Sequence, residues 1–469
     1  MRAGISGDSM NQSTFDAAAM ADARPHVAAR PHWRSGELRG IALLILLAAL
    51  AAVFSCVYIY SKHLNGPPIR SDGYGYYAYL PSVFIDRDLE FDSALKNMPK
   101  GVTSFEVGIN RVQGTGHYFD KYAVGTAVLQ SPFFLGAHVL TGLKGQQQNG
   151  YTGIYQAANT LSAIFYLSIG MLFLYIALRT QYSKEISLAV VALSVFATNV
   201  FHYATYDASF SHVYQFALTS ALLCALLRAR MEPGRLHMRW ACALGGITGL
   251  VALTRLTNIT FALMPAALLM EYWWRNRDLK EFFVNALIMV ACAFCVLFPQ
   301  FLYFKATTGH WLVNAYRVVG EDAHFFWTSP EIANFLFSIR KGVFVWTPIL
   351  IAGALGLPLL VKRFGLLGWS VVLVLCLQVY VCASWYCWWF GGSFGSRPMV
   401  DVMPLFALSL AGLMARFGSH RRPMLAGVAI VLVGLNLTLT YAYWRGFVPF
   451  DNADLGTLSS LPMRLVHGY

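Results

Sequence analysis

Apolar segments of membrane-spanning length follow one another through most of this chain, separated by polar connections. Because a hydrocarbon core about 30 Å thick needs roughly 20 apolar helical residues, and lipid leaves no water to satisfy an open backbone, helices are the expected elements. Hydrophobic residues make up 57% of the chain and charged residues 12%, against about 25% charged in soluble domains. The sequence therefore predicts an all-α polytopic membrane protein. About eleven transmembrane helices are expected, at 41–60, 155–178, 186–201, 211–228, 240–255, 258–274, 282–304, 343–361, 367–383, 399–415 and 424–443.

The distribution of Lys and Arg predicts the orientation of these helices. Positively charged residues favour the cytoplasmic side, and the short connections near 179–184, 228–239, 275–280, 362–363 and 416–422 are basic. The two long connections are nearly balanced: residues 61–121 hold seven basic and seven acidic residues, and residues 305–341 hold four and three. The long connections are therefore expected on the outer face, with the N terminus in the cytoplasm. The basic cytoplasmic connections then account for the net charge of +12, and a nucleic acid partner is not required to explain it.

Three regions are predicted along the chain. Residues 1–38 are polar and rich in Ala, Arg and Pro, which is typical of a disordered cytoplasmic tail. Residues 39–445 form the transmembrane domain, with a first periplasmic loop over 61–154, and residues 446–469 form a periplasmic C-terminal tail.

The apolar stretch 122–140 is ambiguous, because Gly125, Pro132 and Gly136 interrupt it. If this stretch crossed the membrane, the basic connection at 228–239 would lie outside, against the charge rule. We therefore expect a helix that opens at Lys121 and lies in the outer interface.

Asp72 is the first candidate for chemistry, in the run Ser71-Asp72-Gly73-Tyr74-Gly75-Tyr76 just outside the first apolar segment. A carboxylate held at a membrane face can serve as a general base towards a hydroxyl group. Tyr76 and its neighbours carry rings with polar tips that suit the headgroup zone. The alternative interpretation is that Asp72 caps a helix, and the two roles can coexist.

Three cations are expected on the same face as Asp72. Lys121 follows Tyr118-Phe119-Asp120, Arg397 follows the glycine-rich turn 391–396, and Arg255 ends a short apolar helix. Charged residues within spans cost roughly 2.5–3.5 kcal/mol on insertion scales and so mark function, and a guanidinium binds phosphate in a bidentate manner. Together the cations indicate an anionic substrate, although each could instead be an anchor that reaches the lipid headgroups.

Several weaker candidates accompany these four residues. Asp207, in the second outer loop, could orient an acceptor or assist Asp72, whereas Tyr122, beside Lys121, and His310, in the loop after the 282–304 span, could line the same cleft. The acidic run 86–92 matches no cation-binding motif, and a Cys292/Cys295 pair inside an apolar helix favours packing. We predict no metal site and no cofactor, with a divalent metal left open. No nucleotide-binding motif is present.

These elements, in this order and on this side of the membrane, resemble the GT-C superfamily of integral-membrane glycosyltransferases. The similarity covers about residues 40–445. It is greatest to the branch that holds dolichyl-phosphate-mannose protein mannosyltransferases, aminoarabinose transferases of lipid A and rhizobial lipopolysaccharide-core galacturonosyltransferases. The features that carry it are Asp72, the Tyr118–Lys121 element, Asp207 and the Gly391–Arg397 turn. Many members of this branch have an Asp-Glu pair where this chain has Asp72-Gly73, which leaves a single-base mechanism.

The resemblance implies an enzyme of the bacterial inner (plasma) membrane with its active site facing the periplasm. Such an enzyme moves a hexose- or pentose-type sugar from a polyprenyl-phosphate donor to a cell-envelope glycan, lipid or protein. Asp72 would be the general base and Lys121 and Arg397 ligands of the donor phosphate, with inversion at the sugar. A transporter or flippase of a lipid-linked saccharide is the alternative; such transporters often contain repeated halves, and no internal repeat is visible here.

Overall fold

The computed structural model describes residues 35–112 and 115–468. Most of the predicted N-terminal tail, residues 1–34, lies outside the described residues. The predicted all-α class is confirmed, because helices dominate and the described residues contain a single two-stranded sheet. The α-helices are α2 (Ser35–Ser61), α3 (Ser71–Pro81), α4 (Asp92–Lys96), α5 (Gly125–Leu143), α6 (Gly153–Arg179), α7 (Lys184–Phe196), α8 (Val200–Thr205), α9 (His212–Arg230), α10 (Met238–Thr254), α11 (Leu263–Asn276), α12 (Leu279–Thr308), α13 (Ala315–Val318), α14 (Ile332–Phe337), α15 (Val343–Trp346), α16 (Ile349–Phe364), α17 (Leu366–Ser384), α18 (Met403–Met414), α19 (Arg422–Trp444) and α20 (Leu455–His467).

Short helices of other types and two strands complete the elements. The π-helical turn η1 (Ser82–Asp86) continues α3, and the 3-10 helices are η2 (Leu256–Ala262), η3 (Arg397–Val402) and η4 (Ser419–Arg421). The strands β1 (Ile109–Arg111) and β2 (Tyr118–Asp120) pair antiparallel, with Asn110 opposite Phe119.

Each of the eleven predicted apolar segments is helical for most of its length. Seven helical stretches within the described residues are long and apolar enough to cross a membrane: Leu38–Ser61, Gly153–Arg179, His212–Arg230, Leu279–Thr308, Leu366–Ser384, Arg397–Met414 and Arg422–Trp444. The other four predicted segments form the shorter helices α7, α10, α11 and α16. The ambiguous stretch forms α5, which is not one of the seven.

Burial separates the inner helices from those that face lipid. Helix α9 is almost entirely buried, whereas α2, α12 and α19 are largely exposed despite their high hydropathy. An apolar helix with an exposed surface is expected to face lipid rather than water. Helix α9 packs against α6, α10 and η3, so it forms the centre of the transmembrane core.

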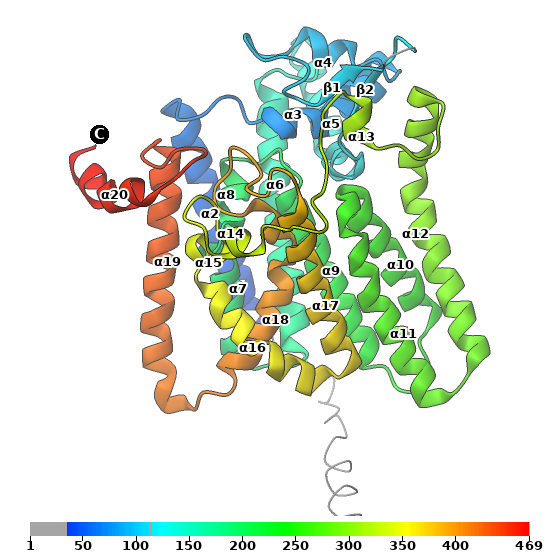
Figure 1. The fold of residues 1–469 in the computed structure, drawn as a ribbon, viewed down its shortest axis with the longest axis vertical. Coiled ribbons are helices and arrows are strands. Elements are labelled where there is room, and N and C mark those ends of the chain that lie inside the picture. Colours follow the sequence, from blue (N-terminus) through cyan, green and yellow to red (C-terminus); the bar gives the residue numbers. More distant parts are fainter. Residues whose placement is uncertain (1–34, 113–114, 469) are drawn as a thin grey trace, which may run out of the picture. The chain divides into compact units, whose positions relative to one another are not determined.

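A second hydrophobic cluster holds together the segments at one end of the long helices. Helices α3, α4 and α13 and the two strands gather at that end (Figure 1). Tyr74, Phe91, Ile109 and Phe119 belong to this cluster, and Tyr303 extends it to the end of α12. We call this end the α3 face. The predicted C-terminal tail also contains a helix, α20, which begins with a capping box of Asp454 and Thr457.

Candidate active site

Asp72 lies in the first turn of α3, which begins after the 62–70 connection. The N-cap residue is Arg70, whose side chain makes no capping hydrogen bond. Asp72 is therefore not the N-cap, which corrects the alternative interpretation. Every residue of α3 from Gly73 to Pro81 is buried, so the helix is internal and presents its carboxylate at its N-terminal end. The helix dipole favours a negative charge at this position.

Two glycines allow α3 to pack closely between two other segments. A Cβ at Gly73 would lie 1.8 Å from Oγ of Ser209, and a Cβ at Gly75 would lie 2.4 Å from the ring of Tyr122. No side chain fits at such distances, so these positions require glycine for close approach. Asp72 is thereby fixed between the loop that holds Ser209 and the segment that holds Tyr122.

Arg397 is the ion-pair partner of Asp72. Nη1 of Arg397 lies 2.8 Å from Oδ2 of Asp72, and the two side chains are 16% and 24% exposed. Burial by itself raises the pKa of Asp72. The positive charges of Arg397 and, to a smaller extent, Lys121 outweigh this effect, so the pKa of Asp72 lies below its usual range. Asp72 is therefore ionised at neutral pH, as a general base must be.

Lys121 follows the second strand of a β-hairpin and is near enough to Asp72 for its charge to lower the pKa of that carboxylate. The Tyr118–Asp120 segment forms β2 and pairs with β1, and helix α5 begins only at Gly125. The expectation that Lys121 opens the interfacial helix is therefore wrong. Tyr and Phe favour strands when a partner strand is present, and here Ile109–Arg111 supplies it. Asp120 is fully buried, and its Oδ1 accepts a hydrogen bond from the backbone N–H of Tyr122 at 2.9 Å, which fixes the turn after the strand.

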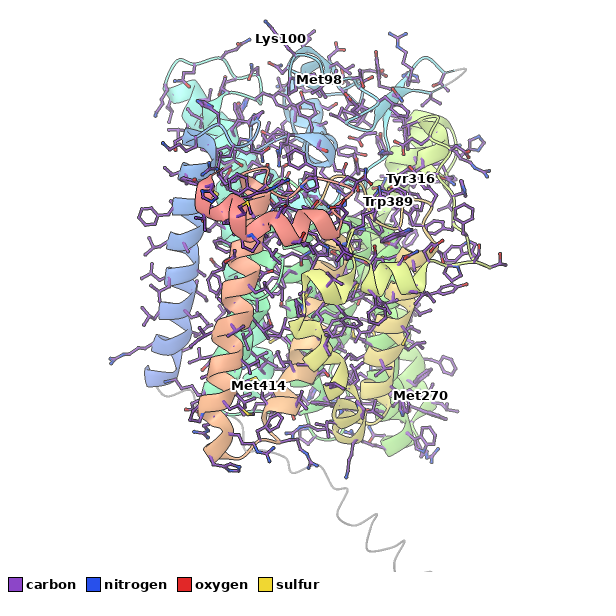
Figure 2. All side chains as sticks on the ribbon, turned by 60° about the vertical axis from the view of Figure 1, so that its left-hand side comes forward. Met98, Lys100, Met270, Tyr316, Trp389 and Met414 are labelled. Atoms are coloured by element: carbon purple, nitrogen blue, oxygen red, sulfur yellow. The ribbon has the colours of Figure 1, made fainter. Side chains whose placement is uncertain are left out.

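Lys121 itself is held by residues from the second long connection. Its Nζ pairs with Glu321 and lies 5.2 Å from the ring of Tyr316 and 5.3 Å from that of Tyr122. Figure 2 shows Tyr316 well below Lys100 and far from Met414, at the level where the long helices end. Glu321 was not predicted, because nothing in a balanced loop distinguishes one acid from the next.

Arg255 belongs to a buried network centred on Asp401. Nε of Arg255 lies 3.0 Å from Oδ2 of Asp401, Nδ2 of Asn258 donates to the same oxygen at 3.0 Å, and Nδ1 of His212 lies 3.1 Å from Oδ1. Asp401 is fully buried in η3, four residues after Arg397. Asp401 was missed, although an acid inside an apolar segment is a signal of function or pairing.

Asp207 is engaged through both carboxylate oxygens. Oδ1 pairs with Arg70, and Oδ2 lies 2.9 Å from Nε2 of His202. Nε1 of Trp444 donates to Nδ1 of His202 at 3.0 Å, so Nε2 carries the proton and donates to Asp207. Burial raises the pKa of Asp207, but Arg70 and His202 hold it well below its usual range. This carboxylate is part of a fixed network.

The remaining candidates divide into two groups. The ring of Tyr76 lies 4.5 Å from that of Tyr122, and burial raises the pKa of both hydroxyls, so both stay neutral beside Asp72. His310 is exposed, and its backbone N–H donates to Thr308; no described contact joins it to the cluster.

The acidic run 86–92 is used locally. Asp86 accepts two hydrogen bonds from Ser93, and Glu90 lies next to His117. Within the described residues, no group of three or more His, Cys, Asp and Glu side chains is placed to hold a metal ion.

The structure therefore brings together Asp72, Tyr76, Lys121, Tyr122, Arg255 and Arg397, which we call the Asp72 cluster. It joins one ionised carboxylate to three cations: Arg397 pairs with Asp72 itself, Lys121 pairs with Glu321, and Arg255 pairs with Asp401. Such an arrangement can accept a proton and bind an anion within one site.

Comparison with solved structures shows the fold. The crystal structure of the Archaeoglobus fulgidus oligosaccharyltransferase in complex with Zn and sulfate has a TM-score of 0.54 and 14% identity, over 85% of this chain and 52% of that chain. ArnT from Cupriavidus metallidurans bound to undecaprenyl phosphate has a TM-score of 0.50 and 14% identity, over 91% of this chain and 70% of that chain. This chain thus spans about half the length of the oligosaccharyltransferase. No protein-family model matches it, and no curated protein matches its sequence. The predicted GT-C resemblance is confirmed at the level of the fold.

Proposed function

We propose that this chain is a glycosyltransferase that moves a sugar from a polyprenyl-phosphate donor to a cell-envelope acceptor on the periplasmic side, with inversion. The observation that carries the proposal is the meeting of Asp72 with Arg397 and Lys121 at the end of a membrane-embedded helical core. The ArnT structure of the same fold contains undecaprenyl phosphate, which supports a lipid phosphate as the ligand of these cations.

The reaction needs one base and a stabilised leaving group. The acceptor hydroxyl attacks the anomeric carbon, and its proton passes to the Asp72 carboxylate. The bond from the anomeric carbon to the phosphate oxygen breaks, and polyprenyl phosphate leaves with the electron pair. Arg397 and Lys121 stabilise the charge that develops on this phosphate. A single displacement inverts the sugar.

Donor binding changes the partners of the cations in this mechanism. Arg397 is paired with Asp72 and Lys121 with Glu321 before the donor arrives. A phosphate that binds both cations competes with these carboxylates. Asp72 then loses its strongest positive neighbour and becomes a better base, because its pKa rises towards the operating pH. Arg255 is held by Asp401, and we assign it a supporting role in phosphate binding.

Asp207 is proposed to position the loop that contacts α3. One partner, Arg70, directly precedes α3, and the other, His202, lies in α8, before the loop that holds Ser209. Asp207 therefore does not touch the reacting atoms in this proposal. Tyr76 and Tyr122 are proposed to contact the sugar.

The test is transfer from a panel of purified polyprenyl-phosphate sugars, with the Asp72→Asn variant beside the wild type. Transfer from one donor should be lost in Asp72→Asn, while the folded variant still binds polyprenyl phosphate. The matched control is Asp322→Asn, because Asp322 is a fully exposed acid next to Glu321. Turnover near the wild-type rate in Asp72→Asn would remove the proposal. Facilitated movement of the lipid-linked sugar across vesicles without transfer would instead identify a flippase.

A further inference from the structure

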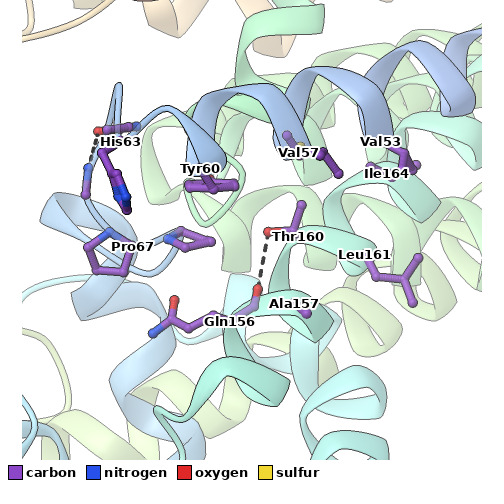
Figure 3. Close-up of a pocket in the computed structure, with 14 residues that line it drawn as sticks. Val53, Val57, Tyr60, His63, Pro67, Gln156, Ala157, Thr160, Leu161 and Ile164 are labelled. Carbon is purple, nitrogen blue, oxygen red and sulfur yellow. Dashed lines mark hydrogen bonds between the residues drawn. The ribbon is translucent and has the colours of Figure 1, made fainter.

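A groove of about 610 Å³ lies between α2 and α6 (Figure 3), and no residue of the Asp72 cluster lines it. Its walls are mostly apolar, with Val53 and Val57 on α2 and Leu161 and Ile164 on α6. The volume falls within the range of about 300–1,000 Å³ that is common for small-molecule sites. None of the residues that line the groove is used by the proposed transfer reaction.

The groove is continuous with the surface that faces lipid. Helix α2 is largely exposed along its length, and Phe54, next to the lining residue Val53, is 73% exposed. A hydrocarbon chain can therefore enter from the bilayer without crossing water. Lipid tails are as apolar as leucine side chains, so the apolar walls alone do not select a ligand.

Selection must come from the end of the groove at the α3 face, which is polar. His63, Asn65 and Gln156 line this end together with Tyr60. The hydroxyl of Tyr60 is buried and has no hydrogen-bond partner among the described residues. A buried hydroxyl is normally paired, and a polar group of a ligand in this groove would supply the missing partner. The groove thus fits a molecule with an apolar chain and a polar head.

The position of the groove separates it from Lys121, one of the two proposed donor cations. The connection that lines its end, residues 63–68, continues through Arg70 to Asp72. Lys121 instead pairs with Glu321, in the connection that follows α12. Figure 1 shows α2 and α12 on opposite sides of α3. A displacement with inversion needs the nucleophile on the side of the sugar opposite the leaving phosphate.

We propose that this groove holds a hydrocarbon chain of a lipid-anchored acceptor, whose polar head extends along residues 63–70 towards Asp72. The acceptor assignment rests on the proposed function, whereas the lipid site does not. The occupant is a membrane amphiphile other than the polyprenyl-phosphate donor.

Binding is tested with a phosphatidylethanolamine that carries a diazirine in its acyl chain, in nanodiscs with the full chain. Crosslinks should map to α2 and α6, and Ala157→Trp should lower them at least fivefold, because Ala157 lines the groove and is exposed. The control is Phe54→Trp, on the outer surface of α2, which should leave the crosslinks unchanged. Undecaprenyl phosphate should not compete. Crosslinking that is insensitive to Ala157→Trp, or that undecaprenyl phosphate displaces, overturns the proposal.

Activity supplies a second, separable readout. With native membranes as acceptor source, sugar transferred by the wild type should appear in the lipid fraction extracted by organic solvent. Ala157→Trp should reduce this about tenfold, and Phe54→Trp less than twofold. Product in the protein or water-soluble glycan fraction overturns the acceptor assignment. Groove crosslinks that respond to Ala157→Trp in a chain that transfers no sugar would uphold the lipid site and reject the proposed function alone.

Discussion

Replacement of Asp72 by Asn should tighten the binding of polyprenyl phosphate even though it removes the proposed base. In the free protein Arg397 is paired with Asp72 at 2.8 Å, and a donor phosphate must compete with this carboxylate and approach it closely. Two unit charges 4 Å apart interact by about 4 kcal/mol at an effective dielectric constant near 20. Both side chains are partly exposed, so screening reduces this value, and we expect a net gain of about 1–2 kcal/mol, or roughly 5–30-fold in affinity.

The dissociation constant of undecaprenyl phosphate, measured by native mass spectrometry or tryptophan fluorescence in nanodiscs, checks this expectation. Because screening weakens charge interactions, the difference between wild type and Asp72→Asn should shrink at high salt. Asp322→Asn should bind as the wild type does. Unchanged or weaker binding in Asp72→Asn would refute the idea that Arg397 is shared between carboxylate and phosphate.

Three further expectations follow from the same geometry. Arg397 keeps the pKa of Asp72 in the free protein below its ordinary value of 3.8. The acid limb of the kcat/KM profile, which reports the free enzyme, should therefore lie at lower pH than the acid limb of the kcat profile, which reports the donor complex. Superimposed profiles would contradict this. Gly73→Ala should cost about 1–3 kcal/mol by overpacking against Ser209 and lower transfer more than tenfold, whereas Gly136→Ala, with no atom within 4 Å of the added Cβ, should leave both intact. Burial lowers the pKa of Lys341 from 10.5 to about 7. Between pH 7 and 10 the unfolded chain therefore binds more protons at Lys341 than the folded chain, and the free energy of unfolding should rise with pH. Lys341→Met should flatten this rise in thermal unfolding, and an unchanged slope would contradict the assignment to Lys341.

Much of the helical core could be predicted from the sequence because lipid enforces a simple rule. An apolar run of about 20 residues has no alternative to a helix in hydrocarbon, so each predicted segment is helical. Asp72, Lys121 and Arg397 were chosen as candidates for a related reason. Charged residues in or near apolar segments are few in this chain, and a charge inside a span is costly unless it has a partner or a function.

The partners of these charges were harder to predict. Glu321 and Asp322 are neighbours in the same loop, so their sequence surroundings are nearly identical. Only the folded chain shows that Glu321 is the acid that pairs with Lys121. The strand at 118–120 depends on pairing with 109–111, a non-local contact that a local pattern does not contain. Asp401 could have been found, since it is an acid within the predicted 399–415 span. The close contacts of Gly73 with Ser209 and of Gly75 with Tyr122 are also non-local, so the sequence around α3 does not contain them.

The pairing of Lys121 with Glu321 links two connections that lie far apart in the chain, and the Asn110 side chain reinforces this link by donating to the Val319 carbonyl at 2.9 Å. Residues 61–121 and 305–341 should therefore be exchanged together in any chimera. A chimera that exchanges only one of them with a protein of similar fold would separate a cation from its counterion. Grafts meant to alter donor choice should carry both segments together.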